Sequence, residues 1–167
     1  MILDPAVLAR TVFVAVMVIA AFEDFRRLII PNLLPIVLCA VWPLYFLAAP
    51  SLYGGLAAIG CALLAFLVGA LLFARGWLGG GDVKLLSVAV LWAGPAGTPA
   101  LLLLTAVLGG ALALFLLMPL GNQLIAATRA LVGQPLLTAE RGLAMPVPYG
   151  VAIAGAALIV ILSPAYG

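Results

Sequence analysis

Residues 52–74 read LYGGLAAIGCALLAFLVGALLFA, an apolar stretch that contains no charged side chain. A helix of about 20 apolar residues is long enough to cross the hydrocarbon core of a bilayer. In water, the same helix would expose a larger apolar surface than soluble proteins normally carry. The stretch therefore predicts a membrane-spanning helix.

Five further apolar runs lie on either side of this stretch. They cover residues 5–23, 33–49, 83–95, 99–120 and 146–163. The 167-residue chain is 68% hydrophobic and 7% charged, whereas ordinary globular proteins are about 25% charged. We therefore expect an all-α integral membrane protein, a polytopic bundle of about six transmembrane helices in which residues 1–167 form a single domain.

Two of these runs differ from the others in their length or in the residues that precede them. The run at 83–95 is short for a bilayer and follows a glycine-rich turn, so we expect its start to be re-entrant or buried within the protein. The first run follows the sequence MILDP, which has an acid where a signal peptide has basic residues. We therefore expect residues 6–22 to be a retained span.

The connections between the runs differ in charge. Cytoplasmic connections retain Lys and Arg. The first, third and fifth connections hold the basic residues Arg26, Arg27, Arg75, Lys84, Arg129 and Arg141. The second (50–51) and fourth (94–98) connections hold none. This predicts that the odd connections are cytoplasmic, that both termini are outside, and that residues 121–144 form a cytoplasmic, interfacial amphipathic segment.

Composition also argues against several classes of function. The net charge of +2 is small and its basic residues are scattered, which argues against nucleic acid as a partner. The chain has no histidine, and Cys39 and Cys61 lie in apolar runs without a CxxC pair, so we expect no metal site and no cofactor. We interpret both cysteines as small core residues, and Trp42, Trp77, Trp92 and Tyr149 as residues of the interfacial aromatic belt.

Two acids stand where the membrane begins. Asp24 lies at the inner end of the first run, and Asp82 follows Gly79, Gly80 and Gly81 at the start of the fourth. Two crossings separate these positions, so both carboxylates are expected at the cytoplasmic face. Two carboxylates in a low-dielectric site cannot both ionise cheaply, and such a pair works as a combined general acid and base, as in aspartic proteolysis. The charged member would activate a water, and the protonated member would polarise a peptide carbonyl.

A structural interpretation of the same residues is also open. The two acids would then cap helices or pair with Arg26, Arg27 and Lys84. The three glycines leave room for a substrate backbone, but they also suit a flexible turn between two spans.

Three motifs resemble those of one family. Gly79-Gly80-Gly81-Asp82-Val83-Lys84 resembles the GxGD signature of intramembrane aspartic proteases, in the form found in type IV prepilin peptidases. Asp24-Phe25-Arg26, followed by Ile30-Pro31-Asn32, is similar to the DxRxxxIPN stretch that carries the first catalytic aspartate of that family. Pro148-Tyr149-Gly150 is similar to a third, weaker motif. The motifs occur in family order and the resemblance covers essentially the whole chain.

The resemblance implies an activity. Larger family members carry a cysteine tetrad and also N-methylate the trimmed pilin, whereas this chain has only two cysteines. It therefore resembles the short peptidases of Flp-type (tight-adherence) pili. These features imply an aspartic endopeptidase of the bacterial inner membrane that removes the basic leader from prepilin or pseudopilin precursors at the cytoplasmic boundary, without a cofactor. The oligomeric state stays open.

Further residues receive supporting roles in this interpretation. They are Gly79, Gly80, Gly81, Lys84, Arg26, Pro31, Asn32, Pro148, Tyr149 and Gly150. Pro31 is interpreted as a break before the second span, with Asn32 as the cap of its helix. Lys84 either tunes the acids or holds a substrate carbonyl, or else it is a positive-inside anchor.

Two other functions compete with proteolysis. One is a small transporter or channel component with Asp24 and Asp82 as an ion relay. Such sites usually lie near the bilayer midplane between repeats, whereas these acids fall at one surface and no inverted repeat is visible. The other is a structural subunit of a secretion machine, in which the acids would be replaceable.

Overall fold

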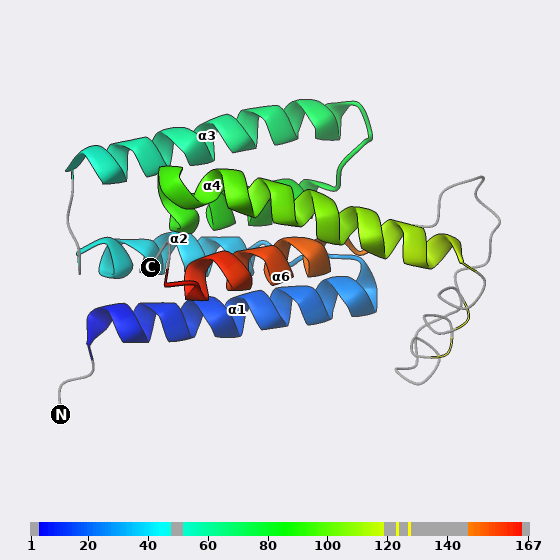
Figure 1. Cartoon of the computed structure of the whole chain (residues 1–167), viewed down its shortest axis with the longest axis horizontal. Helices are drawn as coiled ribbons and strands as arrows, with labels where there is room; N and C mark the ends of the chain where they lie inside the picture. The colour runs from blue at the N-terminus through cyan, green and yellow to red at the C-terminus, as the bar shows by residue number, and fades with distance from the viewer. Residues whose placement is uncertain (1–3, 48–51, 119–122, 124–126, 128–146, 165–167) are drawn as a thin grey trace.

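The computed structural model describes residues 4–47, 52–118 and 147–164, together with the single positions 123 and 127. These residues are all-α (Figure 1). The helices are α1 (Pro5–Arg27), α2 (Leu33–Leu47), α3 (Leu52–Ala74), α4 (Gly80–Leu117) and α6 (Tyr149–Leu162). The predicted amphipathic segment at 121–144 falls outside the described ranges, apart from those two single positions.

Three of the helices are long and apolar enough to cross a membrane, namely Pro5–Arg27, Tyr53–Ala74 and Gly80–Leu117. The shorter helices α2 and α6 are also apolar. The chain is therefore a multi-pass membrane protein. The runs predicted at 83–95 and 99–120 differ from expectation, because they form one helical element, α4.

Gly94 divides α4 into two arms. It has φ +62° and ψ −178°, a left-handed conformation that suits glycine. Pro95 follows as the first residue of the second arm, where a missing N–H costs nothing, and the Thr98 hydroxyl donates to the Gly94 carbonyl at 2.6 Å. The predicted connection at 94–98 was therefore too long, because residues 95–98 are helical and Gly94 alone breaks the helix.

The two arms of α4 run in opposite directions (Figure 1). The first arm begins beside the end of α3, where a Cβ atom at Gly80 would lie 3.3 Å from the Phe73 ring. The second arm returns to the same end of the bundle, because a Cβ atom at Gly109 would lie 2.7 Å from the Tyr149 ring at the start of α6. The chain thus reverses at Gly94 without a loop.

The first arm of α4 forms the centre of the core, as expected for a buried start of this run. Its buried residues include Val83, Leu85 and the stretch 87–90. Trp92 is 2% exposed, stacks on Tyr45 at 5.0 Å and donates its indole N–H to the Leu38 carbonyl at 3.1 Å. The interfacial belt role predicted for Trp92 was therefore wrong, because α2 supplies both an aromatic partner and an acceptor inside the bundle.

α6 lies between α1 and the second arm of α4 (Figure 1) and packs on both. Its buried face is made mostly of small side chains, including Gly150, Ala154 and Ala157. Small residues let helix backbones approach closely in a membrane, where the lipid gives no hydrophobic drive for association. This close packing brings the first turn of α6 against the end of α1.

Candidate active site

Asp24 lies in the last turn of α1 and is 5% exposed. The helix ends just after it, because Leu28 adopts a left-handed conformation with φ 55° and donates its N–H to the Asp24 carbonyl at 2.8 Å. The Asp24 side chain points to another helix. Its Oδ2 accepts the backbone N–H of Gly150 at 2.7 Å.

This contact caps α6 from across the bundle. The first N–H groups of a helix have no partner within the helix. Pro148, at the N-cap position of α6, makes no side-chain capping bond. Asp24 provides the acceptor instead, and a carboxylate at a helix N-terminus also has a favourable interaction with the helix dipole. One of the structural roles considered for Asp24 is therefore real, although the helix it caps is 126 residues away.

Gly150 is required for this contact. A Cβ atom at position 150 would lie 2.8 Å from the Asp24 Oδ2 atom and 2.8 Å from the Ile30 Cδ1 atom. Either approach is too close for a real side chain, so an alanine here would displace the Asp24 carboxylate. The Pro148-Tyr149-Gly150 motif thus lies directly at Asp24, a contact that the sequence analysis did not specify.

Asp82 is the third residue of α4 and is partly exposed. Its carboxylate folds back over the N-cap residue Gly79, where a Cβ atom would lie 2.6 Å from the Asp82 Oδ2 atom. The backbone N–H of Gly79 interacts with this carboxylate, and so does the charge of Asp24. The structure therefore brings the two predicted acids into one site, with the Asp24 carboxylate against the start of α6 and the Asp82 carboxylate at the start of α4.

Ile30 connects the two parts of this site. Its side chain is 7% exposed and contacts Gly150, while a Cβ atom at Gly81 would lie 3.0 Å from the Ile30 Cβ atom. Sequence analysis included Ile30 in the Ile30-Pro31-Asn32 motif but gave a supporting role only to Pro31 and Asn32. A further signal was the apolar pair Ile29-Ile30 in a connection predicted to be cytoplasmic.

The remaining predicted residues lie near the site in different ways. Asn32 directly precedes α2, and its Oδ1 atom accepts a hydrogen bond from the Lys84 ammonium at 2.8 Å. Arg26 lies in the last turn of α1 and is partly buried. Glu23, the neighbour of Asp24 in the chain, forms an ion pair with Arg27 at 3.3 Å.

Metal-binding side chains do not gather in the described parts of the chain, where no group of three or more His, Cys, Asp or Glu residues is suitably placed. The two carboxylates lie beside backbone amides from Gly79 and Gly150, an arrangement that suits proton transfer between carboxyl groups.

A multi-pass helical membrane protein with two carboxylates at one end of its bundle has the features of an intramembrane aspartic peptidase. A family model described as the type IV leader peptidase family matches residues 11–114, a range that includes Asp24 and Asp82. The chain belongs to this family of bacterial inner-membrane enzymes and is an aspartic leader peptidase. No curated protein and no solved structure gave a match.

Proposed function

We propose that this peptidase removes the basic leader from Flp-type prepilins at the cytoplasmic boundary of the membrane, with Asp24 and Asp82 as the catalytic pair. One observation carries the proposal. Two acids that are 58 positions apart in the sequence interact at one end of the bundle, and each is oriented by a backbone N–H group at the start of a helix.

The reaction needs one proton on the pair. The ionised carboxylate accepts a proton from a water molecule as the water oxygen attacks the scissile carbonyl carbon. The protonated carboxylate donates to the carbonyl oxygen during this attack. The attack leaves an intermediate with two hydroxyl groups on the former carbonyl carbon. As the C–N bond breaks, the amine nitrogen takes the proton held by the pair, and one hydroxyl group of the intermediate returns its proton to a carboxylate. Acid and amine products leave, and the pair again holds one proton. No covalent intermediate with the protein is required.

The small residues beside Asp82 favour an unwound substrate. A peptide bond inside a helix is shielded by its own hydrogen bonds and side chains, so cleavage requires an extended segment. A side chain at Gly79, the N-cap residue of α4, would lie against the Asp82 carboxylate, so the glycine leaves that carboxylate open to such a backbone. A small residue, which the family resemblance implies is glycine, is expected before the cut.

The topology proposed with this function has six spans, with each arm of α4 as one span, and both termini outside. Arg26, Arg27, Arg75 and Lys84 lie at the end of the bundle that holds Asp24 and Asp82. By the positive-inside rule this end faces the cytoplasm. The leader of a single-span precursor would meet the acids there.

The direct test is co-expression with Flp-type prepilins, scored for a leader-sized mobility shift. We expect the wild-type enzyme to trim at least one precursor, and Asp24→Asn and Asp82→Asn each to abolish trimming. The double variant should be no worse than either single variant, because the two groups act as a unit. Near-normal trimming by either asparagine variant would reject the pair.

A further inference from the structure

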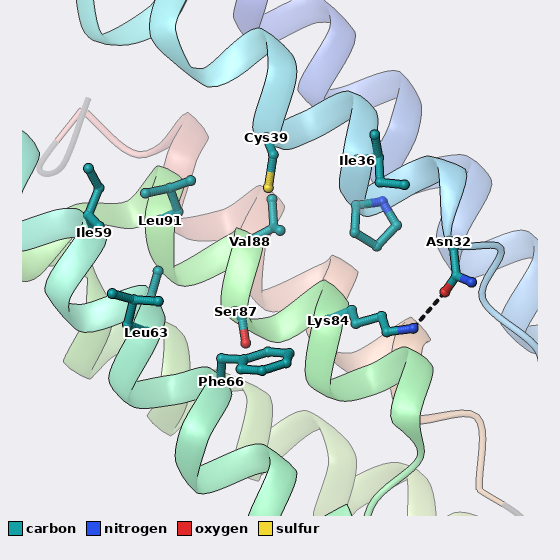
Figure 2. Close-up of a pocket in the computed structure, with 12 residues that line it drawn as sticks. Asn32, Ile36, Cys39, Ile59, Leu63, Phe66, Lys84, Ser87, Val88 and Leu91 are labelled. Carbon is teal, nitrogen blue, oxygen red and sulfur yellow. Dashed lines mark hydrogen bonds between the residues drawn. The ribbon is translucent and has the colours of Figure 1, made fainter.

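A groove of about 600 Å³ opens between α2 and α3, and its floor is the first arm of α4 (Figure 2). We call it the α2–α3 groove. α2 and α3 each pack on α4. Within the described residues their backbones come close at few points, one of which is near their connection, where the Phe46 ring lies against Gly55. The bundle therefore leaves a space between two helices that both face lipid.

The spacing of the lining residues shows the direction of the groove. On α3 they include Ile59, Ala62 and Phe66, and on α4 they include Val88 and Leu91. Each set lies on one face of its helix. Ile59 to Phe66 spans about 10 Å at 1.5 Å per residue. The α2–α3 groove therefore runs along the helices and is as long as two turns of a partner helix.

The α2–α3 groove has one polar end. Figure 2 shows the hydrogen-bonded Lys84 and Asn32 at that end, with Leu91 and Ile59 towards the other. Cys39 also lines the groove and is exposed, with its sulfur directed towards Val88. Our interpretation of Cys39 as a core residue was therefore wrong, because the groove leaves this face of α2 uncovered.

The polar end lies close to the acid pair. Lys84 is two residues beyond Asp82, and Asn32 is two residues beyond Ile30, which packs against Gly81. Two residues of extended backbone span at most about 7 Å. A chain that leaves the groove at Asn32 therefore needs only a few extended residues to reach the carboxylates.

Building on the proposed function, we propose that the α2–α3 groove seats the first two turns of the substrate's hydrophobic helix. Lys84 and Asn32 then hold the unwound segment that leads to the acids. A side-chain ridge of one helix packs into the space between two others in this way.

The polar end of the groove favours a polypeptide over a lipid chain. An unwound peptide at membrane depth exposes N–H and C=O groups that need partners. The Asn32 amide has donors and an acceptor, and the Lys84 ammonium has donors beyond the one directed at Asn32. A lipid tail would contact the apolar lining, but it has no N–H and C=O groups to pair with the acceptor and donors of the Asn32 amide.

Cys39 makes the proposal testable by disulfide cross-linking in membranes. The probe is a Flp-type prepilin that the wild-type enzyme trims, with single cysteines placed along its hydrophobic helix. The enzyme carries Asp82→Asn to retain the precursor and Cys61→Ser to leave Cys39 as the sole thiol. We expect links to recur every three to four positions within the first two turns after the cleavage site. In the matched control, Cys39→Ser with Cys61 retained, we expect none.

A second variant tests the α2–α3 groove without cross-linking. Ala62→Phe fills the groove and should lower kcat/KM on the order of tenfold, mainly through KM. Ala57→Phe, on an exposed face of α3 outside the groove, should cleave like the wild type.

The outcomes separate the two proposals. Normal cleavage by Ala62→Phe, or the absence of any link to Cys39 from a precursor that the wild type trims, would overturn the groove assignment and leave the proposed function standing. Links between two enzyme copies through Cys39, or loss of bound phospholipid from Ala62→Phe without a change in cleavage, would likewise overturn it in favour of a second copy or a lipid. Failure of the wild type to trim any precursor would overturn the proposed function itself.

Discussion

Asp24 combines a proposed catalytic role with a structural one. The hydrogen bond from Gly150 fixes the orientation of its carboxylate and also completes the first turn of α6. Substituting Asp24 therefore removes a reactive group and an α6 cap at the same time. A change at Gly150 is more informative, because it leaves the carboxylate in the chain and displaces it, together with the end of the Ile30 side chain.

We expect Gly150→Ala to reduce cleavage about a hundredfold, because small displacements of a catalytic group are this costly. The added methyl group would lie 2.8 Å from the Asp24 Oδ2 atom. Gly155→Ala on the same helix is the control, since its methyl group would meet Leu108 at an ordinary 3.5 Å. The measurement is the initial rate of leader removal in membranes. Equal rates for the two variants would show that Asp24 does not need this orientation.

The pair also predicts a pH dependence. In the proposed mechanism, cleavage needs one ionised and one protonated carboxylate. The rate should therefore fall at low pH, where no base remains, and at high pH, where no acid remains. A pH series on the detergent-purified enzyme, with folding followed in parallel, should give a bell-shaped profile. A rate that stays constant across the range in which the protein is folded would contradict a shared proton.

At the scale of elements, Gly94 decides how α4 is built. A single left-handed residue followed by Pro95 lets 38 residues form two opposed arms where a straight helix would project from the bundle. The sequence indicated two apolar runs that meet around Gly94, Pro95 and Gly97. It did not reveal that the reversal needs only one non-helical residue, because the left-handed conformation of Gly94 depends on the packing of both arms.

Gly94→Ala should lower the free energy of unfolding by about 1–2 kcal/mol, the cost of a left-handed conformation for a residue with a side chain. Gly110→Ala is a closely matched control. A Cβ atom at either position meets no atom within 4 Å, but Gly110 has a helical conformation. The control should therefore be neutral or slightly stabilising. Unfolding in mixed micelles measures both variants, and equal effects would exclude backbone strain as the cause.

For the whole molecule, apolar run length and charge were sufficient to predict a helical membrane protein, and the motifs were sufficient to predict the family. Contacts between segments that are far apart in the sequence could not be predicted from it. The Asp24–Gly150 bond joins residues 126 positions apart, and the burial of Trp92 depends on a carbonyl from Leu38. The apolar character of Cys39 likewise gave no sign of whether a neighbouring helix would cover it.

The proposed orientation is tested by a reporter fused after Gly167. We expect it to behave as periplasmic, because six crossings return the chain to the side on which it began. Labelling of residues 94–98 should likewise require access from outside. Cytoplasmic labelling of these residues would reverse the topology and move the acids away from the side where a leader is displayed.

The capping of α6 by Asp24 has a consequence for biosynthesis. During translation, α1 and both arms of α4 are made before residue 150. A growing chain can therefore hold both acids in the membrane while the N–H group that orients one of them has not yet been synthesised. An incomplete product that stops before α6 carries the carboxylates without their final arrangement. With Asp24 in its proposed catalytic role, we therefore expect cleavage activity to arise only after residue 150 has been made.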